Sequence, residues 1–139
     1  MKLTVKTRCG LRVLLELARA ADEKICLKGW VLTESLEISE SFLEQLMIPL
    51  RRGGLVKTRR GCNGGYYLGE VPESISLLKV IELFEGDIGG FGCSDEICDK
   101  FDTCAAAAGI SSLAANFTVQ ADNINLAQLL KPVSGDSEN

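Results

Sequence analysis

The sequence predicts a mainly α-helical protein with one small β-hairpin, and two stretches of the chain carry that prediction. Residues 39–68 combine an amphipathic helix that ends at a glycine pair with two short strands around a glycine-rich tip. From residue 105 onward, apolar side chains recur at steps of three and four, which is typical of a helix that packs against a second copy of itself. The pattern is that of a winged helix-turn-helix domain followed by a long C-terminal dimerisation helix.

The first helix is predicted over residues 4–21. Its apolar face consists of Leu11, Leu14, Leu15 and Ala18. Arg8 and Arg12 lie early on this helix, where they are candidates for contact with phosphate groups. A shorter helix is predicted over residues 27–36, with Trp30, Val31 and Leu36 as its packing residues.

The third helix follows a turn at residues 37–39 and begins after Ser39, a favourable N-cap. Its apolar face consists of Phe42, Leu43, Leu46, Met47 and Leu50. Pro49 is expected to bend or end the helix, although Leu50 continues the periodicity. The Gly53–Gly54 pair ends it, because glycine tolerates the left-handed dihedrals of a helix C-cap. Two helices joined by a tight turn form a helix-turn-helix.

Residues 55–68 are predicted to form the wing, with strands over 55–60 and 66–68 on either side of a tip at 61–65. The basic residues of this wing are Lys57, Arg59 and Arg60. A basic ribbon suits the backbone or the minor groove of DNA, while the helix before it suits the major groove.

Beyond the wing, a break at residues 72–74 precedes a helix predicted over 75–86, and a cysteine loop follows over 87–103. The inward residues of that helix are Leu77, Leu78, Ile81 and Phe84. The next helix carries an apolar seam of Ile110, Leu113, Phe117, Ala121 and Ile124. We interpret this seam as a dimer interface, with an intramolecular core helix as the alternative. Residues 126–130 are expected to add a last helical turn.

With 139 residues, of which 46% are hydrophobic, the chain has the size of one domain with at most a small appendage. Its predicted segments are a winged helix-turn-helix domain (1–72), a connecting helix and cysteine loop (73–103), a dimerisation helix with a final turn (104–130) and a disordered tail (131–139). No apolar run reaches the roughly 18–20 residues that span a bilayer, and no signal-peptide core follows the charged start. We therefore expect a cytoplasmic protein that does not associate with a membrane.

Charge is distributed unevenly along the chain. Residues 1–60 hold 12 Lys and Arg against 7 Asp and Glu, whereas residues 61–139 hold 3 against 12. The asymmetry suggests an N-terminal part that faces DNA and an acidic part turned away from phosphate.

The chain contains 6 cysteines and no histidine. Without a secretory signal, such cysteines are more often metal ligands or redox thiols than disulfides. Cys93, Cys98 and Cys104 form a cluster whose spacing differs from the short CxxC pairs of structural zinc sites. Thiolates suit iron–sulfur clusters, with zinc or free redox thiols as alternatives. Cys62 is expected to be exposed at the wing tip, and Cys26 to pack.

Several groups of residues also carry a resemblance to known proteins. They are Met1–Thr4 with Lys6 and Arg8; Ile38–Ser39 with Leu43–Leu46; Arg51, Gly54–Val56, Arg60–Gly61 and Gly64–Tyr66 with Leu68; and Asn123–Ile124 with Leu126. Together they resemble the IscR/NsrR/CymR (Rrf-type) family of bacterial winged-helix transcription regulators, nearly from end to end. The residues of the wing are the part of this resemblance that is most specific for the family.

The resemblance implies a homodimer that binds a pseudo-palindromic site on double-stranded DNA. It implies that Ser39, Glu40, Ser41, Glu44 and Gln45 face base edges and that Arg60 enters the minor groove. The other DNA-binding candidates are Arg8, Arg51, Lys57 and Arg59. The chemistry agrees, since Gln pairs with adenine, Glu accepts from cytosine N4, and Arg suits a narrow minor groove. An ion pair between Glu44 and Arg51 is an alternative use of those two side chains.

The segment from Cys93 to Cys104 resembles the three-cysteine sensor loop of the cluster-binding members, which implies a 2Fe–2S or 4Fe–4S cluster. Two departures concern the ligands. Four residues separate Cys93 from Cys98, where such relatives have five. The position of the family's histidine ligand is occupied by Ala107, and that of the carboxylate used by some relatives is occupied by Arg8. The remaining candidates for a fourth ligand are Asp95, Glu96, Asp99, Asp102, Cys9 of the partner subunit, and an external thiol or water.

The sequence thus predicts a repressor or activator whose DNA binding is set by an iron–sulfur cluster that senses iron–sulfur, redox or nitric-oxide status. The alternative is a regulator of the same fold without a cluster, controlled by a partner protein or by thiol oxidation. A small electron carrier is disfavoured by the basic wing. An enzyme is not expected, because the chain lacks histidine, a nucleophile–base pair and a phosphate-binding loop.

Overall fold

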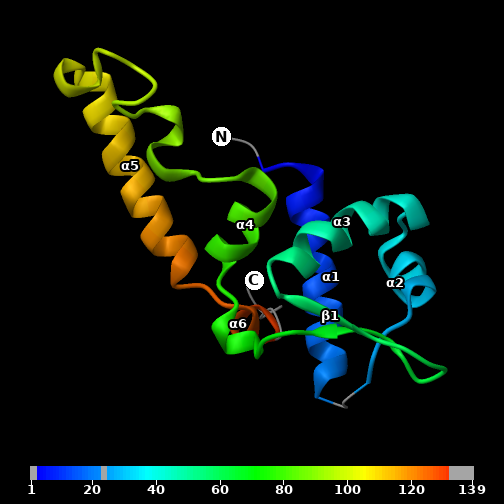
Figure 1. Cartoon of the computed structure of the whole chain (residues 1–139). Helices are drawn as coiled ribbons and strands as arrows, with labels where there is room; N and C mark the ends of the chain where they lie inside the picture. The colour runs from blue at the N-terminus through cyan, green and yellow to red at the C-terminus, as the bar shows by residue number, and fades with distance from the viewer. Residues whose placement is uncertain (1–2, 23–24, 132–139) are drawn as a thin grey trace, which may run out of the picture.

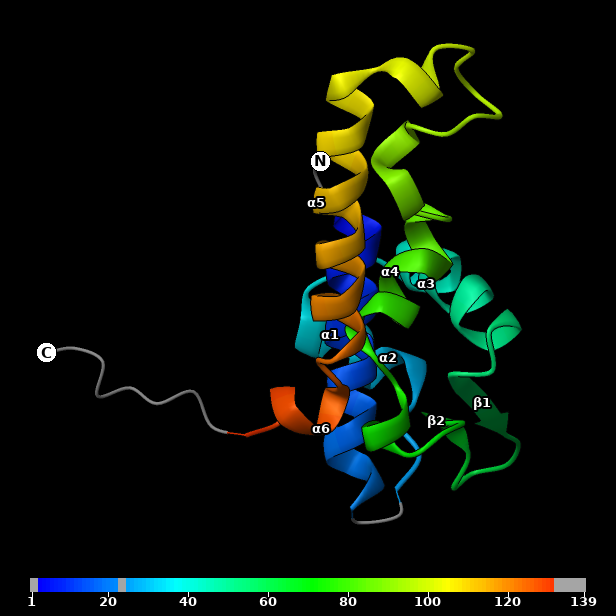
Figure 2. The ribbon, with the colours of Figure 1, turned by 90° about the vertical axis from the view of Figure 1, so that its left-hand side faces the viewer.

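The computed structural model describes residues 3–22 and 25–131, so the predicted disordered tail lies outside the described residues except for Lys131. The described chain forms a helical head that contains the hairpin, and an arm made of α5 and the loop before it (Figure 1). The turned view in Figure 2 shows the loop at the far end of α5, and α5 joins the head through its packing on α4. This architecture confirms the predicted fold class. None of the helices in these two ranges is long and apolar enough to cross a membrane.

Helix α1 (Val5–Ala21) is the central element of the head. It contacts α2, α3, α4, α6 and β2. The Thr4 hydroxyl caps it by accepting a hydrogen bond from the backbone N–H of Thr7 at 3.4 Å. Leu14 and Ala18 of the predicted face are buried, whereas Leu11 and Leu15 are half-buried. Val13 and Leu17, which the prediction left out, complete the buried face. Burying this face against five neighbours makes α1 the helix on which the rest of the head is assembled.

Helix α2 (Gly29–Leu36) begins two residues later than predicted. The backbone of Leu27 is already paired with Tyr66 of the hairpin, by hydrogen bonds of 2.9 and 2.7 Å. The prediction that Trp30 packs is wrong, since its side chain is 62% exposed. Leu32 and Leu36 provide the buried face of α2. Trp30 lies two positions before Leu32 and therefore about 200° around the helix from it, on the opposite side.

Helix α3 (Glu40–Arg52) follows a left-handed turn at Glu37, where φ is 55°. The hydroxyl of Ser39 caps it, accepting a hydrogen bond from the backbone N–H of Phe42 at 3.1 Å. The helix continues through Pro49 to Arg52, as the periodicity at Leu50 indicated. It ends at the predicted glycine pair.

Strands β1 (Val56–Arg59) and β2 (Gly65–Leu68) form the antiparallel wing. Val56 lies opposite Leu68, and Arg59 lies opposite Gly65. Val56 is buried whereas the rest of β1 is exposed. The base of the hairpin is therefore anchored in the core, and its basic residues reach solvent.

The segments that enter and leave the arm return to the head. The short 3-10 turn η1 (Pro72–Ser74) leads into α4 (Leu77–Glu85), and α5 is followed by α6 (Leu126–Leu129). Ser76 and Asn125 form a backbone bridge that joins the two segments. The buried side chains of Ile75, Val80 and Leu126 lie in the same hydrophobic core as α1, α2 and α3.

The arm consists of two 3-10 turns, η2 (Gly89–Gly92) and η3 (Phe101–Thr103), and of α5 (Ala105–Asp122). The seam predicted on α5 lies on one side of the helix, but only its C-terminal part packs against α4. Phe117 and Ala121 pack within the chain, in a small cluster with Ile81 of α4. The exposed members are Ile110 and Leu113, of which Leu113 is 61% exposed. The intramolecular interpretation is thus confirmed for Phe117 and Ala121, and the dimer interface stays a prediction for the exposed side chains.

Candidate nucleic-acid interface

The outward face of α3 consists of side chains that the sequence predicts to contact base edges. Leu43, Leu46, Met47 and Leu50 face the core, so the opposite side of the helix faces solvent. The exposed residues there are Glu40, Ser41, Glu44 and Gln45. Ser39 is also exposed, but its hydroxyl is used in the helix cap and lies 3.4 Å from the hydroxyl of Ser41.

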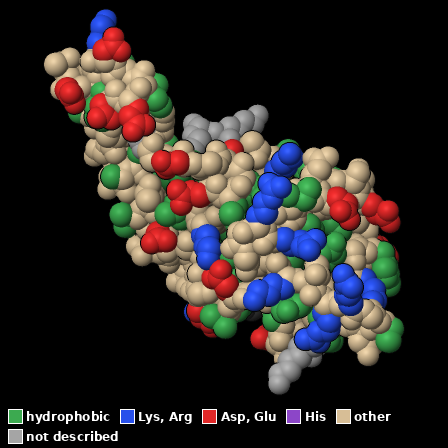
Figure 3. Space-filling view, viewed as in Figure 1, with side chains coloured by type: hydrophobic (Ala, Val, Ile, Leu, Met, Phe, Trp, Pro, Cys, Tyr) green, Lys and Arg blue, Asp and Glu red, His purple; other side chains and the backbone are tan. Residues whose placement is uncertain are grey.

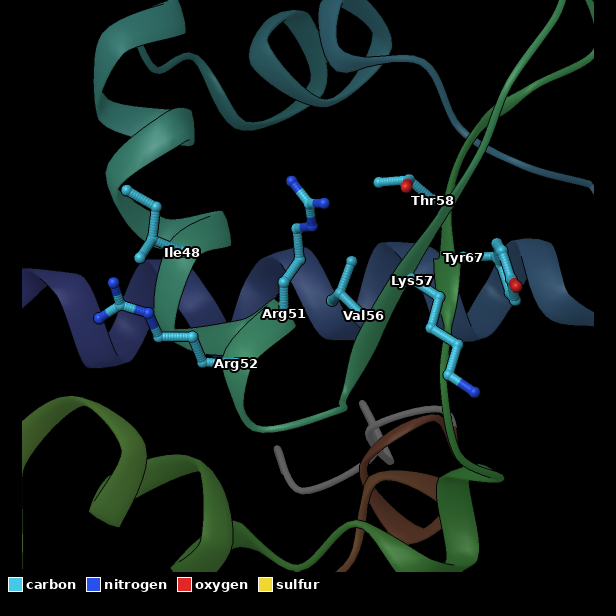
Figure 4. Close-up of a pocket in the computed structure, with 7 residues that line it drawn as sticks. All are labelled: Ile48, Arg51, Arg52, Val56, Lys57, Thr58 and Tyr67. Carbon is cyan, nitrogen blue, oxygen red and sulfur yellow. The ribbon is translucent and has the colours of Figure 1, made fainter.

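A groove of about 600 Å³ lies between the end of α3 and the wing (Figure 4). Its lining consists of Ile48, Arg51, Arg52, Val56, Lys57, Thr58 and Tyr67. The three basic side chains are exposed, and Figure 4 shows them spread along the groove rather than gathered at one point. A groove with several separate positive charges fits a chain of phosphate groups.

The wing carries the remaining predicted contacts. The guanidinium of Arg59 lies 5.5 Å from the ring centre of Tyr67, a cation–π contact that favours one direction for this side chain. Arg60 is exposed where the strand enters the tip. Lys57 pairs with Tyr67 across the ladder, so Lys57 and Arg59 share one face of the hairpin.

Within residues 3–22 and 25–131, the basic side chains of α3 and the wing form no ion pair with a carboxylate. The ion pairs of these residues lie elsewhere and join Arg19 to Glu16 and Lys79 to Glu70. Glu44 and Arg51 do not form the ion pair considered as their alternative use. Figure 3 shows Lys and Arg gathered over the head, while Asp and Glu gather over the arm. The predicted charge asymmetry is therefore also a division in space.

Arg51 and Lys57 are the predicted DNA contacts that line this groove, and sequence reasoning missed its other lining residues, among them Ile48, Arg52 and Tyr67. Ile48 and Arg52 follow Glu44 at successive steps of four, so helical spacing alone could have located them on the outward face. Tyr67 carried no such signal, because strand alternation does not show which face of a hairpin meets solvent. Arg8 is exposed on α1 but does not line the groove.

The cysteine loop presents its thiols unevenly. Cys93 is half-buried, whereas Cys98 and Cys104 are exposed. In the part of the chain that the structure describes, no group of three or more Cys, His, Asp or Glu side chains could hold a metal ion. The chemistry of three thiols suits an iron–sulfur cluster, but the single chain does not gather them around one point. To hold an iron–sulfur cluster, the loop from Cys93 to Cys104 would need a different conformation, or ligands would have to come from outside the chain.

The other candidate ligands differ in accessibility. Cys9 is buried in the core of the head, where a cysteine acts as a small apolar side chain. This position disfavours it as a ligand for another subunit's loop. The loop carboxylates are all exposed: Asp95, Glu96, Asp99 and Asp102. Cys62 is exposed, as the sequence predicts for the wing tip, and Cys26 is half-buried.

Comparison with known proteins places this geometry in a family. The model of the Rrf2 family, described as an iron-dependent transcriptional regulator, matches residues 3–132. The chain belongs to the Rrf2 family. This confirms the resemblance found in the sequence. It also agrees with the expectation that the protein is not an enzyme, because its Rrf2 relatives are named as transcriptional regulators.

Two relatives illustrate the range of the Rrf2 family. The chain is 45% identical to the HTH-type transcriptional regulator CymR of Bacillus subtilis over 89 residues, 63% of each chain. It is 33% identical to the regulator IscR of Aliivibrio salmonicida over 132 residues, 94% of this chain and 77% of the relative. The match therefore spans less than two thirds of the length of CymR.

Two solved structures of Rrf2 proteins have the same fold. CymR of B. subtilis, whose structure is described as that of a global cysteine regulator, superimposes with a TM-score of 0.80 at 30% identity, over 96% of this chain and 99% of that one. IscR of T. potens gives a TM-score of 0.78 at 27% identity, over 100% of this chain and 97% of that one. The arm is thus part of the shared fold as much as the head.

Proposed function

We propose that this chain is a homodimeric DNA-binding transcriptional regulator. The observation that carries the proposal is the row of exposed basic side chains along α3 and the wing, none of which pairs with a carboxylate of the described chain. Unpaired cations on one surface release counterions when they meet phosphate groups, which is the main source of affinity for DNA. The relatives named as transcriptional regulators support the same function.

In this proposal α3 enters the major groove and the wing reaches the adjacent backbone and minor groove. Gln45 and Glu44 are polar, exposed and on the outward face of α3, so they can reach base edges. Arg51 and Lys57 contact phosphates from the groove between helix and wing. Arg60 enters the minor groove. Phosphate contacts fix the position of the helix, and the side chains of its first two turns read the sequence.

The exposed side chains of α5 form the proposed dimer interface. Leu113 and Val119 are 61% and 60% exposed, and the small residues Ala105 and Gly109 lie between Leu113 and the start of the helix. Small side chains permit two helices to approach closely, and the exposed apolar residues gain from burial. A two-fold symmetric dimer formed through α5 would present two copies of α3 to the two halves of a pseudo-palindromic site.

Control of DNA binding is proposed to act through the loop from Cys93 to Cys104. An iron–sulfur cluster supplies redox and small-molecule sensitivity when it is bound, and the thiols of Cys93, Cys98 and Cys104 would hold it. A second candidate is control without a cluster, by thiol oxidation or by a partner protein. The dispersed thiols of the single chain favour this candidate, as does similarity to CymR.

A salt titration tests the DNA-binding function. Duplexes selected by the protein from a random-sequence library are titrated at several salt concentrations. We expect log Kd to rise linearly with log salt concentration, and the slope to fall by about one in each of the variants Arg51→Ala and Lys57→Ala. Affinity that does not depend on salt, or a failure to select any duplex, would contradict the proposal.

A further inference from the structure

The side chain of Lys28 leaves the start of α2 and reaches the tip of the wing. Its ammonium donates hydrogen bonds to the carbonyl oxygen of Gly64 at 3.0 Å and to that of Gly61 at 3.3 Å. The same Gly61 carbonyl accepts from the backbone N–H of Gly64 at 3.0 Å, which closes the tip into a turn. Lys28 therefore binds both ends of this turn at once.

The backbone on either side of the tip is held against the segment that precedes α2. Leu27 and Tyr66 exchange two backbone hydrogen bonds of 2.9 and 2.7 Å. A Cβ atom on Gly65 would lie 2.5 Å from the carbonyl oxygen of Leu27, and φ at Gly65 is +147°. Only glycine permits this approach, which brings the Gly64 carbonyl within reach of the Lys28 ammonium.

Beyond that backbone contact, the tip is not packed on the head. A hollow of about 370 Å³ separates them, and its lining includes Cys26, Arg59, Cys62 and Asn63. Within residues 3–22 and 25–131, Lys28 provides the side-chain hydrogen bonds to residues 61–65. An apolar contact does not replace it, since Gly61, Cys62 and Asn63 are all exposed. Apart from these backbone hydrogen bonds, Lys28 is thus the side chain of the described residues that holds the tip.

We infer that Lys28 is a positioning residue that orders the wing for DNA and is not itself a phosphate contact. This inference rests on the proposed DNA-binding function. Arg60 directly precedes the turn that Lys28 closes, so the direction of Arg60 depends on the order of that turn. Ordering the tip before binding removes an entropic cost that the complex would otherwise bear. Composition alone would assign Lys28 to phosphate, because it is one more cation on a basic surface.

The first test measures the tip without DNA. In Lys28→Met the apolar stem is kept and the ammonium is lost. We expect faster amide hydrogen exchange at Gly64, with exchange at Leu14 and Leu46 in the core and the thermal unfolding midpoint close to wild type. Lys57→Met is the matched control, since it removes the same charge from the wing itself and should leave exchange at Gly64 unchanged. Unchanged exchange at Gly64 in Lys28→Met would overturn the inference.

The second test separates positioning from direct contact by a double-mutant cycle on a duplex selected by the wild-type protein. Lys28→Met should weaken binding roughly fivefold to tenfold in the wild-type background and less than about twofold in Arg60→Ala. Lys57→Met should weaken binding equally in both backgrounds and lower the salt slope by about one.

Equal losses for Lys28→Met in both backgrounds, together with a lower salt slope, would make Lys28 a phosphate contact and overturn the inference. No loss in either background would overturn it as well, because an ordered tip would then be irrelevant to binding. If the wild-type protein selects no duplex, the proposed function fails and takes the inference with it. That outcome is visible before any variant is compared, so the two failures are distinguishable.

Discussion

The carboxylate of Glu85, at the end of α4, accepts a hydrogen bond from the hydroxyl of Thr7, in the first turn of α1. The same carboxylate oxygen accepts from the backbone N–H and the hydroxyl of Thr4, at 2.9 and 2.8 Å. The arm leaves the head at Gly86, directly after this carboxylate. Glu85 therefore ties the root of the arm to the central helix of the head.

These hydrogen bonds predict a pH dependence. The bond from Thr7, followed by those from Thr4, holds the pKa of Glu85 below its usual value. A lowered pKa in the folded state adds stability above the pKa of the unfolded chain and loses it as the pH falls through the folded value. We expect Glu85→Gln to lower the thermal unfolding midpoint at pH 7, and the difference from wild type to shrink as both are acidified below the usual glutamate range. Glu82→Gln, exposed on the same helix, is the control, and an equal effect of both variants would contradict the role of Glu85.

If the exposed side chains of α5 form a dimer interface, one charged substitution there should weaken the dimer. Leu113→Glu places a carboxylate in the proposed interface, where its desolvation has no compensating partner. We expect the dimer dissociation constant to rise about tenfold or more, measured by sedimentation velocity over a range of concentrations. Val71→Glu alters a side chain of similar exposure outside α5 and should leave the dimer intact. A wild-type protein that is monomeric at all concentrations would contradict the proposed interface.

The proposal that the cysteine loop holds an iron–sulfur cluster predicts a coloured protein. Purified without oxygen, the wild-type chain should show visible sulfur-to-iron charge-transfer bands with matching iron and sulfide content. Cys98→Ala should lose them, because it removes one of the loop thiols. Cys62→Ala, a cysteine of equal exposure in the wing, should keep them. A wild-type protein that stays colourless after reconstitution and still binds DNA would favour control by thiol oxidation or by a partner.

The helices and the hairpin could be predicted because their sequence signals act on residues close by in the chain. The caps at Ser39 and the glycine pair after Arg52 define α3, and the tip glycines define the wing. The error at Trp30 has a physical reason. A helix of eight residues shows too few turns for its periodicity to identify the buried face.

The parts of the site that the sequence did not predict depend on contacts between distant segments. Lys28 lies 33 residues before Gly61, and Glu85 lies 78 residues after Thr7, so no local pattern pairs them. The division of the α5 seam is of the same kind, since Phe117 packs inward only because α4 lies beside it. Predicted base contacts such as Gln45 stay predictions, although their exposure on α3 agrees with them.

The central claim is that α3 and the wing bind DNA, and the affinity of Arg60→Ala for a duplex selected by the wild-type protein tests it most directly. Arg19→Ala is the control, because it removes one charge from an ion pair on α1. We expect Arg60→Ala to weaken binding by about 1–3 kcal/mol, roughly fivefold to 150-fold, with an unchanged unfolding midpoint. Arg19→Ala should bind like wild type. Equal affinity of Arg60→Ala and wild type would contradict the assignment of the wing to DNA.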